Sequence, residues 1–271
     1  MGTWPGLVGH SLGGALAVKY ALDALGEEPL PRPDRLVLVS PMIGVTAFAR
    51  FAGAAGLPAV LPAFAKAAWL GVVPEFNPFK YNSFPVNAAR QAHRLTAAIH
   101  GQMARDERDG RLARLPPVLT FQSVLDFTVS TSAVVSGLYA RLPSNGSELV
   151  IFEVNQAAHV SPLLRSPRGG GLDQVLPPPP RRFRTTVVAN ADPGTLEVVA
   201  RTTEAGGLDE QSLPLGASYP ADVYSLSHVA LPFPDDDALY GTRPDPSEDF
   251  GVNLGAIAAR GERGALLVGL D

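Results

Sequence analysis

The sequence Gly-His-Ser-Leu-Gly at residues 9–13 constrains the fold of this chain more than any other feature. Residues 15–25 follow it with a helical pattern of about three turns, which Gly26 ends. Only Leu7 and Val8 precede it as part of a strand. A sharp strand-to-helix turn that raises the serine hydroxyl above the sheet edge requires the residues two before and two after the serine to be nearly free of side chains, as the glycines are here. The alternative is a glycine-rich helix start that only packs closely against a sheet.

Composition narrows the functions that such a fold could serve. The 271 residues carry a formal net charge of −4, which argues against a protein that binds the phosphate backbone of nucleic acids. The chain contains no cysteine, so disulfides, thiolate metal sites and a cysteine nucleophile are excluded. The sequence also contains no apolar stretch typical of a transmembrane helix, and no dinucleotide, phosphate-loop or metal-binding pattern. We therefore predict no cofactor and no bound metal.

The sequence Gly-His-Ser-Leu-Gly-Gly at residues 9–14 resembles the nucleophile elbow of the α/β-hydrolase superfamily. It is most similar to the serine aminopeptidase, lysophospholipase and monoacylglycerol-lipase-like branch, over roughly residues 5–160. The resemblance implies a mostly parallel sheet flanked by helices, with strands that precede the elbow. Because both ends of the chain look like the interior of a longer sequence, we expect a fragment that lacks those N-terminal strands.

The resemblance divides the chain into three parts. Residues 1–41 correspond to the hydrolase core with the elbow. Residues 42–115 are rich in Ala, Leu and Phe and show no clear strand, which favours a helical cap over the active site, with another layer of core helices as the alternative. Residues 116–271 continue the core, with an additional strand at 184–190, a helix at about 193–205, and C-terminal loops.

Asp126 is the predicted catalytic acid. It ends the buried-strand pattern of residues 117–126, and a helix at 132–142 and a strand at 148–154 follow it. An acid here fits the family's chain order of serine, acid and histidine. Its carboxylate would hold the imidazole of the base in the required tautomer and stabilise the imidazolium. The alternative is that Asp126 caps the helix that follows.

Two histidines compete for the role of the base. His228 lies in a Ser-His-Val sequence before Pro-Phe-Pro, which resembles the base loop of many relatives, and it is our prediction. His159 lies just beyond the strand that follows the acid, where ordinary α/β-hydrolases carry the base, and it is the alternative. His10 flanks the serine inside the motif and is not expected to be the base. His93 and His100 lie in a helical stretch without a third ligand for a metal.

Together these residues predict a serine hydrolase that cleaves carboxylic esters through an acyl-enzyme. Ser11, Asp126 and His228, with His159 as the alternative base, would form the triad. The backbone N–H of Leu12 would be one donor of the oxyanion hole. The apolar composition of the predicted cap favours a small-molecule or lipid-like ester as substrate.

Two other functions stay open from the sequence alone. The first is a non-catalytic α/β-hydrolase-like binding module, because a fold does not imply a function. The second is a serine aminopeptidase, in which Glu75 or the aspartates at 235–237 would bind the substrate's amine. The sequence contains no pattern that decides acyl length, oligomeric state or compartment.

Overall fold

The computed structural model describes residues 6–26, 30–44, 69–71, 84–124, 126, 129–153, 172–192 and 195–218. The chain divides into two compact units. The first comprises Met1–Gly44 and Leu95–Leu231, and the second comprises Val45–Arg94 and Pro232–Asp271. The candidate serine and acid both lie in the first unit, which holds the main sheet.

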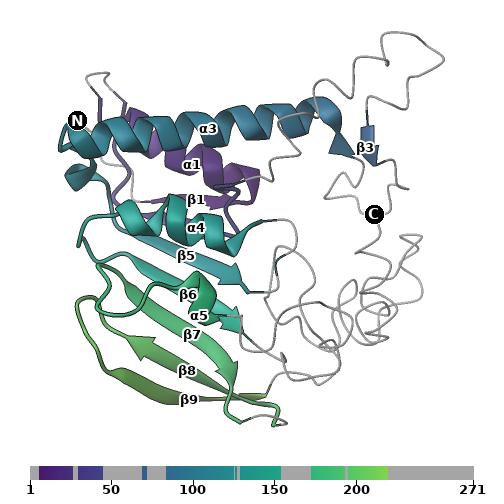
Figure 1. Ribbon diagram of the computed structural model, residues 1–271, viewed down its shortest axis with the longest axis vertical. Coiled ribbons are helices and arrows are strands. Elements are labelled where there is room, and N and C mark those ends of the chain that lie inside the picture. Colours follow the sequence, from purple (N-terminus) through teal and green to yellow (C-terminus); the bar gives the residue numbers. More distant parts are fainter. Residues whose placement is uncertain are drawn as a thin grey trace. The chain divides into compact units, whose positions relative to one another are not determined.

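A seven-stranded sheet forms the centre of the first unit (Figure 1). Its order is β1-β2-β5-β6-β7-β8-β9, and the pairs from β1 to β7 are all parallel. This confirms the predicted α/β class with a mostly parallel sheet. The strands are β1 (Leu7–His10), β2 (Leu36–Val39), β5 (Val118–Ser123), β6 (Glu148–Glu153), β7 (Arg184–Asn190), β8 (Glu197–Thr203) and β9 (Glu210–Ser218).

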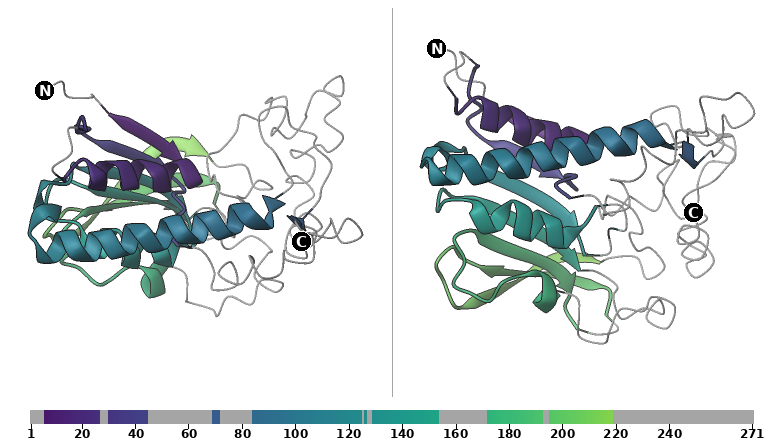
Figure 2. Two further views of the ribbon diagram at one scale, coloured as in Figure 1. Left: turned by 90° about the horizontal axis from the view of Figure 1, so that it is seen from above. Right: turned by 45° about the horizontal axis from the view of Figure 1, so that its top comes forward.

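Helices cover one face of the parallel strands. The helices α1 (Leu12–Asp23), α3 (Val86–Arg108) and α4 (Thr131–Gly137) lie on the same side of the sheet in both views of Figure 2. The strand side chains on this face are fully buried, including Leu36, Leu38, Leu149 and Ile151, each at 0% exposure. Short strands with near-continuous aliphatic sequence are what a buried parallel sheet requires. The hydrophobic core therefore lies between the sheet and these helices.

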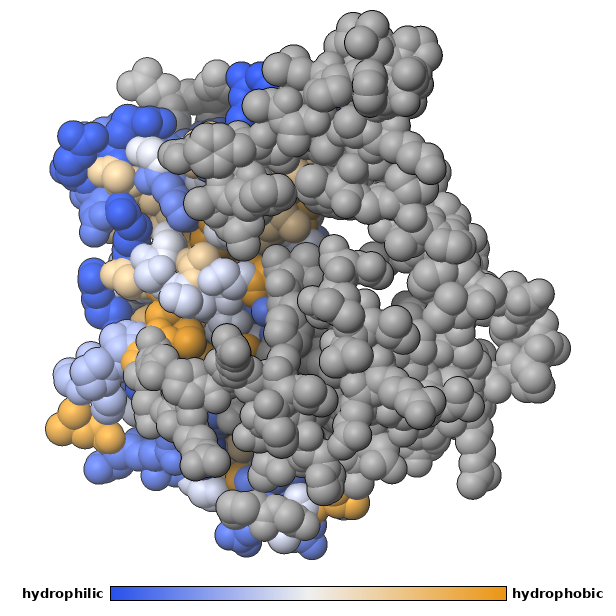
Figure 3. Space-filling model, turned by 45° about the vertical axis from the view of Figure 1, so that its right-hand side comes forward, coloured by the Kyte–Doolittle hydropathy of each residue, from blue (hydrophilic) through white to orange (hydrophobic). Residues whose placement is uncertain are grey.

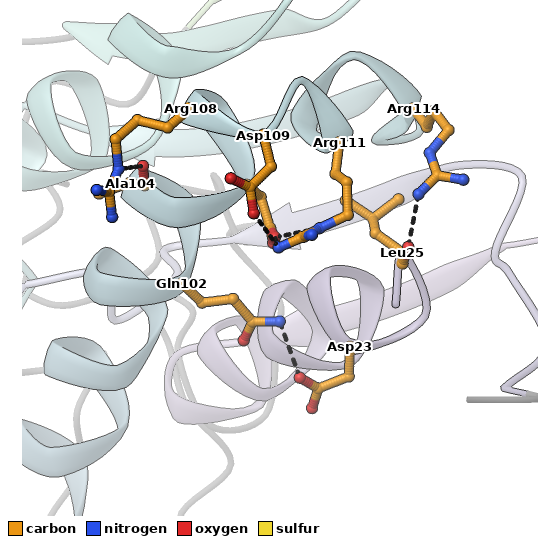
Figure 4. Close-up of polar contacts among 9 residues, drawn as sticks. Asp23, Leu25, Gln102, Ala104, Arg108, Asp109, Arg111 and Arg114 are labelled. Atoms are coloured by element: carbon orange, nitrogen blue, oxygen red, sulfur yellow. Dashed lines mark hydrogen bonds and ion pairs between the residues drawn. The ribbon is translucent and has the colours of Figure 1, made fainter. Parts of the chain in front are cut away.

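Polar contacts hold α3 and the turn after it against α1 (Figure 4). Gln102 donates to the Asp23 carboxylate at 3.1 Å, and Arg114 donates to the Leu25 carbonyl at 2.7 Å. Arg114 belongs to the 3-10 helix η3 (Arg111–Arg114). The second half of α3 is amphipathic, with buried residues at the spacing of one helix face; these are Thr96, Ile99, Met103 and Asp106.

The described part of residues 42–115 is only partly helical. Strands β3 (Trp69–Gly71) and β4 (Phe84–Pro85) pair antiparallel in a separate two-stranded sheet. Within this range, the residues from Leu95 onward belong to the same unit as the main sheet. A cap formed by residues 42–115 remains a prediction. Among the described residues, no helix combines the length and the apolar character needed to cross a bilayer.

The predicted helix at 193–205 is wrong. The described residues in this range form β8, which pairs antiparallel with β7 on one side and with β9 on the other. The sequence of β8 contains two valines and two threonines, and β-branched side chains favour strands over helices. The turn between β8 and β9 contains Gly206 in the left-handed region, with φ 76°.

The helix and the strand expected after Asp126 are both present and differ only in length, whereas β9 was not predicted. The helix expected at 132–142 is α4 followed by the 3-10 helix η4 (Tyr139–Arg141), and the strand expected at 148–154 is β6. A short helix α5 (Leu172–Val175) precedes β7. Strand β9 is exposed along its whole length, including Leu213 and Leu215. Figure 3 shows hydrophobic residues scattered among hydrophilic ones on the described part of one face.

Candidate active site

Ser11 occupies a sharp turn between β1 and α1. Its backbone has φ 50° and ψ −120°, a conformation that side-chain-bearing residues rarely adopt. The Ser11 N–H donates to the Val39 carbonyl at 3.0 Å, while its own carbonyl accepts from Gly14 at 3.0 Å and Met42 at 2.9 Å. Main-chain hydrogen bonds to β2, α1 and the loop after β2 thus fix this turn. Such strain, of about 1–3 kcal/mol, is concentrated at functional sites.

Two of the glycines around Ser11 leave no space for a side chain, but only one of them is at a position that the motif predicts. A Cβ added to Gly9 would lie 2.5 Å from the Gly13 carbonyl oxygen, and one added to Gly14 would lie 2.8 Å from Cβ of Pro41. Both positions are therefore closed to any side chain. A Cβ on Gly13 would meet nothing within 4 Å. The expectation that the residue two after the serine must lack a side chain is wrong, because the close approach occurs one residue later.

The Ser11 hydroxyl is not used as a helix cap. Serine at the start of a helix commonly accepts a hydrogen bond from a backbone N–H of the first turn. Ser11 makes no such side-chain bond to α1, and its side chain is partly exposed. The alternative interpretation is a glycine-rich helix start that only packs closely against the sheet, and Gly14 does make such a close contact. This contact does not explain why a serine occupies position 11 or why its backbone is strained.

Ser40 is a second strained serine, which sequence reasoning missed. It follows β2, has φ 43°, and is 1% exposed. In the described part of the chain, Ser11 and Ser40 are the non-glycine residues with positive φ. The Ser40 N–H donates to the Phe121 carbonyl at 2.8 Å, which continues the β2–β5 ladder past the end of β2. No sequence motif marks this position, so only the backbone geometry could reveal it.

Asp126 lies beyond the carboxyl end of β5 and is partly exposed. Its Oδ1 accepts from the Val129 N–H at 2.8 Å, and its Oδ2 accepts from Nε2 of Gln122 at 3.3 Å. The alternative that Asp126 caps α4 is wrong, because Ser130 is the cap and accepts from the Ala133 N–H at 3.1 Å. The carboxylate is instead held by its own loop and by β5.

Ser11 and Asp126 follow strands that end at the same edge of the sheet. Strands β1, β2 and β5 are parallel, and the last residues of β1 and β2, His10 and Val39, are in register with Phe121, two residues before the end of β5. Parallel strands collect the residues that follow them at one edge, where ligands of open α/β sheets bind. The candidate bases His159 and His228, as well as Glu75 and residues 235–237, lie outside the described residues.

Two of the other histidines lie on described elements near the candidate site's strands and helices. His10 is exposed and ends β1 beside the serine. His100 packs against α4, where a Cβ on Gly137 would lie 2.9 Å from its Nε2. A search of the described residues finds no group of three or more His, Asp or Glu side chains that could hold a metal ion.

Comparisons with known proteins identify two similar solved structures. No protein-family model and no curated protein matches the sequence. A monoacylglycerol lipase from Paleococcus ferrophilus matches 55% of this chain with 18% identity and a TM-score of 0.36. A soluble variant of monoglyceride lipase from Saccharomyces cerevisiae matches 53% with 14% identity and a TM-score of 0.35. The matches cover 57% and 51% of those chains, so this chain spans about half of their length. Both are named as lipases of monoacylglycerols, one of the groups that residues 9–14 resemble.

Proposed function

We propose that this chain carries the nucleophile and the acid of a serine hydrolase that cleaves carboxylic esters. The observation that carries the proposal is the conformation of Ser11. A serine with φ 50° and a partly exposed side chain, on a turn between a parallel strand and a helix, is the arrangement of a nucleophile elbow. Asp126, at the same sheet edge and held by two donors, supplies a candidate acid.

The proposed mechanism is acyl transfer. Oγ of Ser11 attacks the ester carbonyl carbon while an imidazole, from His228 or alternatively His159, accepts the hydroxyl proton. The imidazolium then protonates the leaving alcohol as the C–O bond breaks, and the acyl group stays on Ser11. Water, deprotonated by the same imidazole, then attacks the acyl carbonyl carbon. The bond from this carbon to Oγ of Ser11 breaks, the imidazolium returns the proton to Oγ, and the carboxylic acid is released. Asp126 stabilises the imidazolium in both steps.

The start of α1 is suited to stabilise the developing oxyanion. The first N–H groups of a helix have no partner within the helix and point toward its N-terminus, where the helix dipole is positive. Leu12 is the first residue of α1, so its N–H is the proposed donor. The Leu12 side chain is 38% exposed directly beside the serine, which favours an apolar acyl group. A small-molecule or lipid-like ester is the proposed substrate class.

The test combines covalent labelling with turnover of p-nitrophenyl esters of increasing acyl length. A fluorophosphonate probe should label the Ser11 peptide in the folded wild-type chain. We expect Ser11→Ala to abolish labelling and lower kcat by about 10³-fold or more. Ser40→Ala is the matched control, since Ser40 is also strained and lies after the neighbouring strand but is buried; it should retain labelling.

The same assay distinguishes the two candidate bases. His228→Ala should abolish turnover and His159→Ala should retain it; the reverse result would assign the base to His159. If a folded wild-type chain is not labelled, or if Ser11→Ala is labelled like the wild type, the hydrolase proposal is wrong. The fold would then serve a non-catalytic function.

A further inference from the structure

Gln122 is a polar residue of β5, whereas the residues beside this part of β5 on the neighbouring strands are aliphatic. In the register of the sheet, Gln122 lies beside Ile151 of β6. Thr120, the previous residue in the same row of side chains on this face of β5, lies between Leu38 and Leu149. Gln122 is 1% exposed. A buried amide in such a row is unfavourable unless its hydrogen bonds are satisfied, so its presence calls for a specific partner.

The Gln122 amide points its nitrogen toward three oxygen atoms. Nε2 lies 3.3 Å from each of Oδ2 of Asp126, Oγ1 of Thr131 and the Ser123 carbonyl oxygen. The Thr131 hydroxyl donates its own proton to the Ser123 carbonyl at 2.8 Å, so it acts as an acceptor toward Gln122. A reversed amide would place Oε1 against these same oxygens, one of them on a carboxylate. The surroundings therefore orient the amide with its N–H groups toward Asp126.

The orientation leaves the other end of the amide unsatisfied. Oε1 of Gln122 is buried and has no hydrogen-bond partner among the described residues. A side chain serving only the stability of the fold would be better replaced by an aliphatic residue of similar volume, as on the neighbouring strands. The retained amide thus points to its one charged contact, the carboxylate of Asp126.

We propose that Gln122 is a positioning residue that holds the Asp126 carboxylate in the plane needed to bind the base. This inference rests on the proposed function, in which Asp126 accepts the imidazole N–H. The Val129 N–H binds Oδ1 from the loop, and Gln122 binds Oδ2 from β5, so two donors on different elements restrict rotation of the carboxylate. An ionised carboxylate accepts about four hydrogen bonds, so binding these two donors does not by itself exclude the imidazole.

Two substitutions separate positioning from packing. Gln122→Met keeps the length and the volume but removes the donor. Gln122→Glu keeps the shape, and its carboxyl can donate to Asp126 only while it is protonated. As the pH rises and this carboxyl ionises, it faces Asp126 with a like charge instead. Thr120→Val is the matched control, because Thr120 is buried in the same row of β5 and is not a partner of Asp126 in the proposed mechanism.

The experiment measures kcat and KM for a p-nitrophenyl ester between pH 5 and 9, with the full chain and with folding checked by circular dichroism. We expect Gln122→Met to lower kcat by about tenfold at every pH with little change in KM, well below the about 10⁴-fold effect of replacing a triad carboxylate. For Gln122→Glu, the ratio of its kcat to that of the wild type should fall as the pH rises. Thr120→Val should keep the wild-type kcat and pH profile.

Other outcomes overturn the inference in distinguishable ways. If Ser11-dependent turnover is present but Gln122→Met keeps the wild-type kcat, or the kcat ratio of Gln122→Glu does not change with pH, Gln122 does not position the acid. If Gln122→Met does not fold, the pH profile of Gln122→Glu alone decides. If the wild-type chain shows no Ser11-dependent turnover, the proposed function fails, and the role of Gln122 falls with it.

Discussion

The parallel and antiparallel parts of the sheet differ in the burial of their side chains and in their relation to the described residues of the candidate site. Strands β2, β5 and β6 bury one complete face under helices, with Leu38 and Ile151 at 0% exposure. Strand β9 is exposed at every position, and Leu213 is 64% exposed. Ser11 and Asp126, the candidate site residues that the structure describes, follow the parallel strands β1 and β5. The buried core and both described residues of the candidate site therefore belong to the parallel part, and the hairpin of β8 and β9 extends the sheet.

Truncation of one aliphatic residue in each part tests this difference most directly. We expect Ile151→Ala to lower the free energy of unfolding by about 2–5 kcal/mol, because it leaves a cavity between the sheet and the helices. Leu213→Ala should change it by less than about 0.5 kcal/mol, since its side chain is already in water. Urea unfolding followed by circular dichroism measures both, with similar m-values expected. Equal losses would mean that the hairpin belongs to the core.

A smaller effect is expected at two adjacent glycines of the turn. Gly14→Ala should lower the free energy of unfolding by about 1–3 kcal/mol, because its Cβ meets the rigid ring of Pro41. Gly13→Ala is the matched control in the same helical turn, and it should be neutral or raise stability by up to about 1 kcal/mol. The same urea titrations decide. A destabilising Gly13→Ala with a tolerated Gly14→Ala would show that the motif, not the contact with Pro41, identifies the tight position.

Features of the fold and site that depend on local sequence could be predicted. The turn at Ser11 follows from glycines near a serine between a strand and a helix, and the place of Asp126 follows from an acid after an aliphatic run. The hairpin was missed because β8 also contains Glu, Ala and Arg, which suit a helix; its β-branched residues and Gly206 were the available signals.

Features that depend on contacts between distant segments could not be predicted. The tight position at Gly14 is defined by Pro41, which belongs to the loop after the next strand. The strain at Ser40 and the orientation of the Gln122 amide likewise arise from packing of β2, β5 and α4, and no short motif encodes them. The choice between His228 and His159 remains a prediction.

The smallest expected effect concerns a hydroxyl that joins β5 and β6 inside the parallel part. The Tyr139 side chain is fully buried, and its hydroxyl donates to the Glu148 carbonyl at 2.6 Å. Burial raises the pKa of this hydroxyl above its ordinary value of 10.0. The folded protein thus keeps the proton at a pH where the unfolded chain loses it. The ionisation of this group does not change the unfolding free energy below pH 10, and above pH 10 the unfolding free energy falls as the pH rises, by up to about 1.4 kcal/mol per pH unit.

Tyr139→Phe should therefore be less stable than the wild type at neutral pH by about 0.5–1.5 kcal/mol, the loss of one buried hydrogen bond. Above pH 10 the difference should shrink, because phenylalanine has no proton to lose. Urea unfolding at pH 8 and at pH 10.5–11 measures this change in slope. A constant difference across that range would mean that the Tyr139 hydroxyl has the same pKa in the folded and unfolded chains. Water would then reach the interior beneath α4 more readily than the burial of its residues indicates.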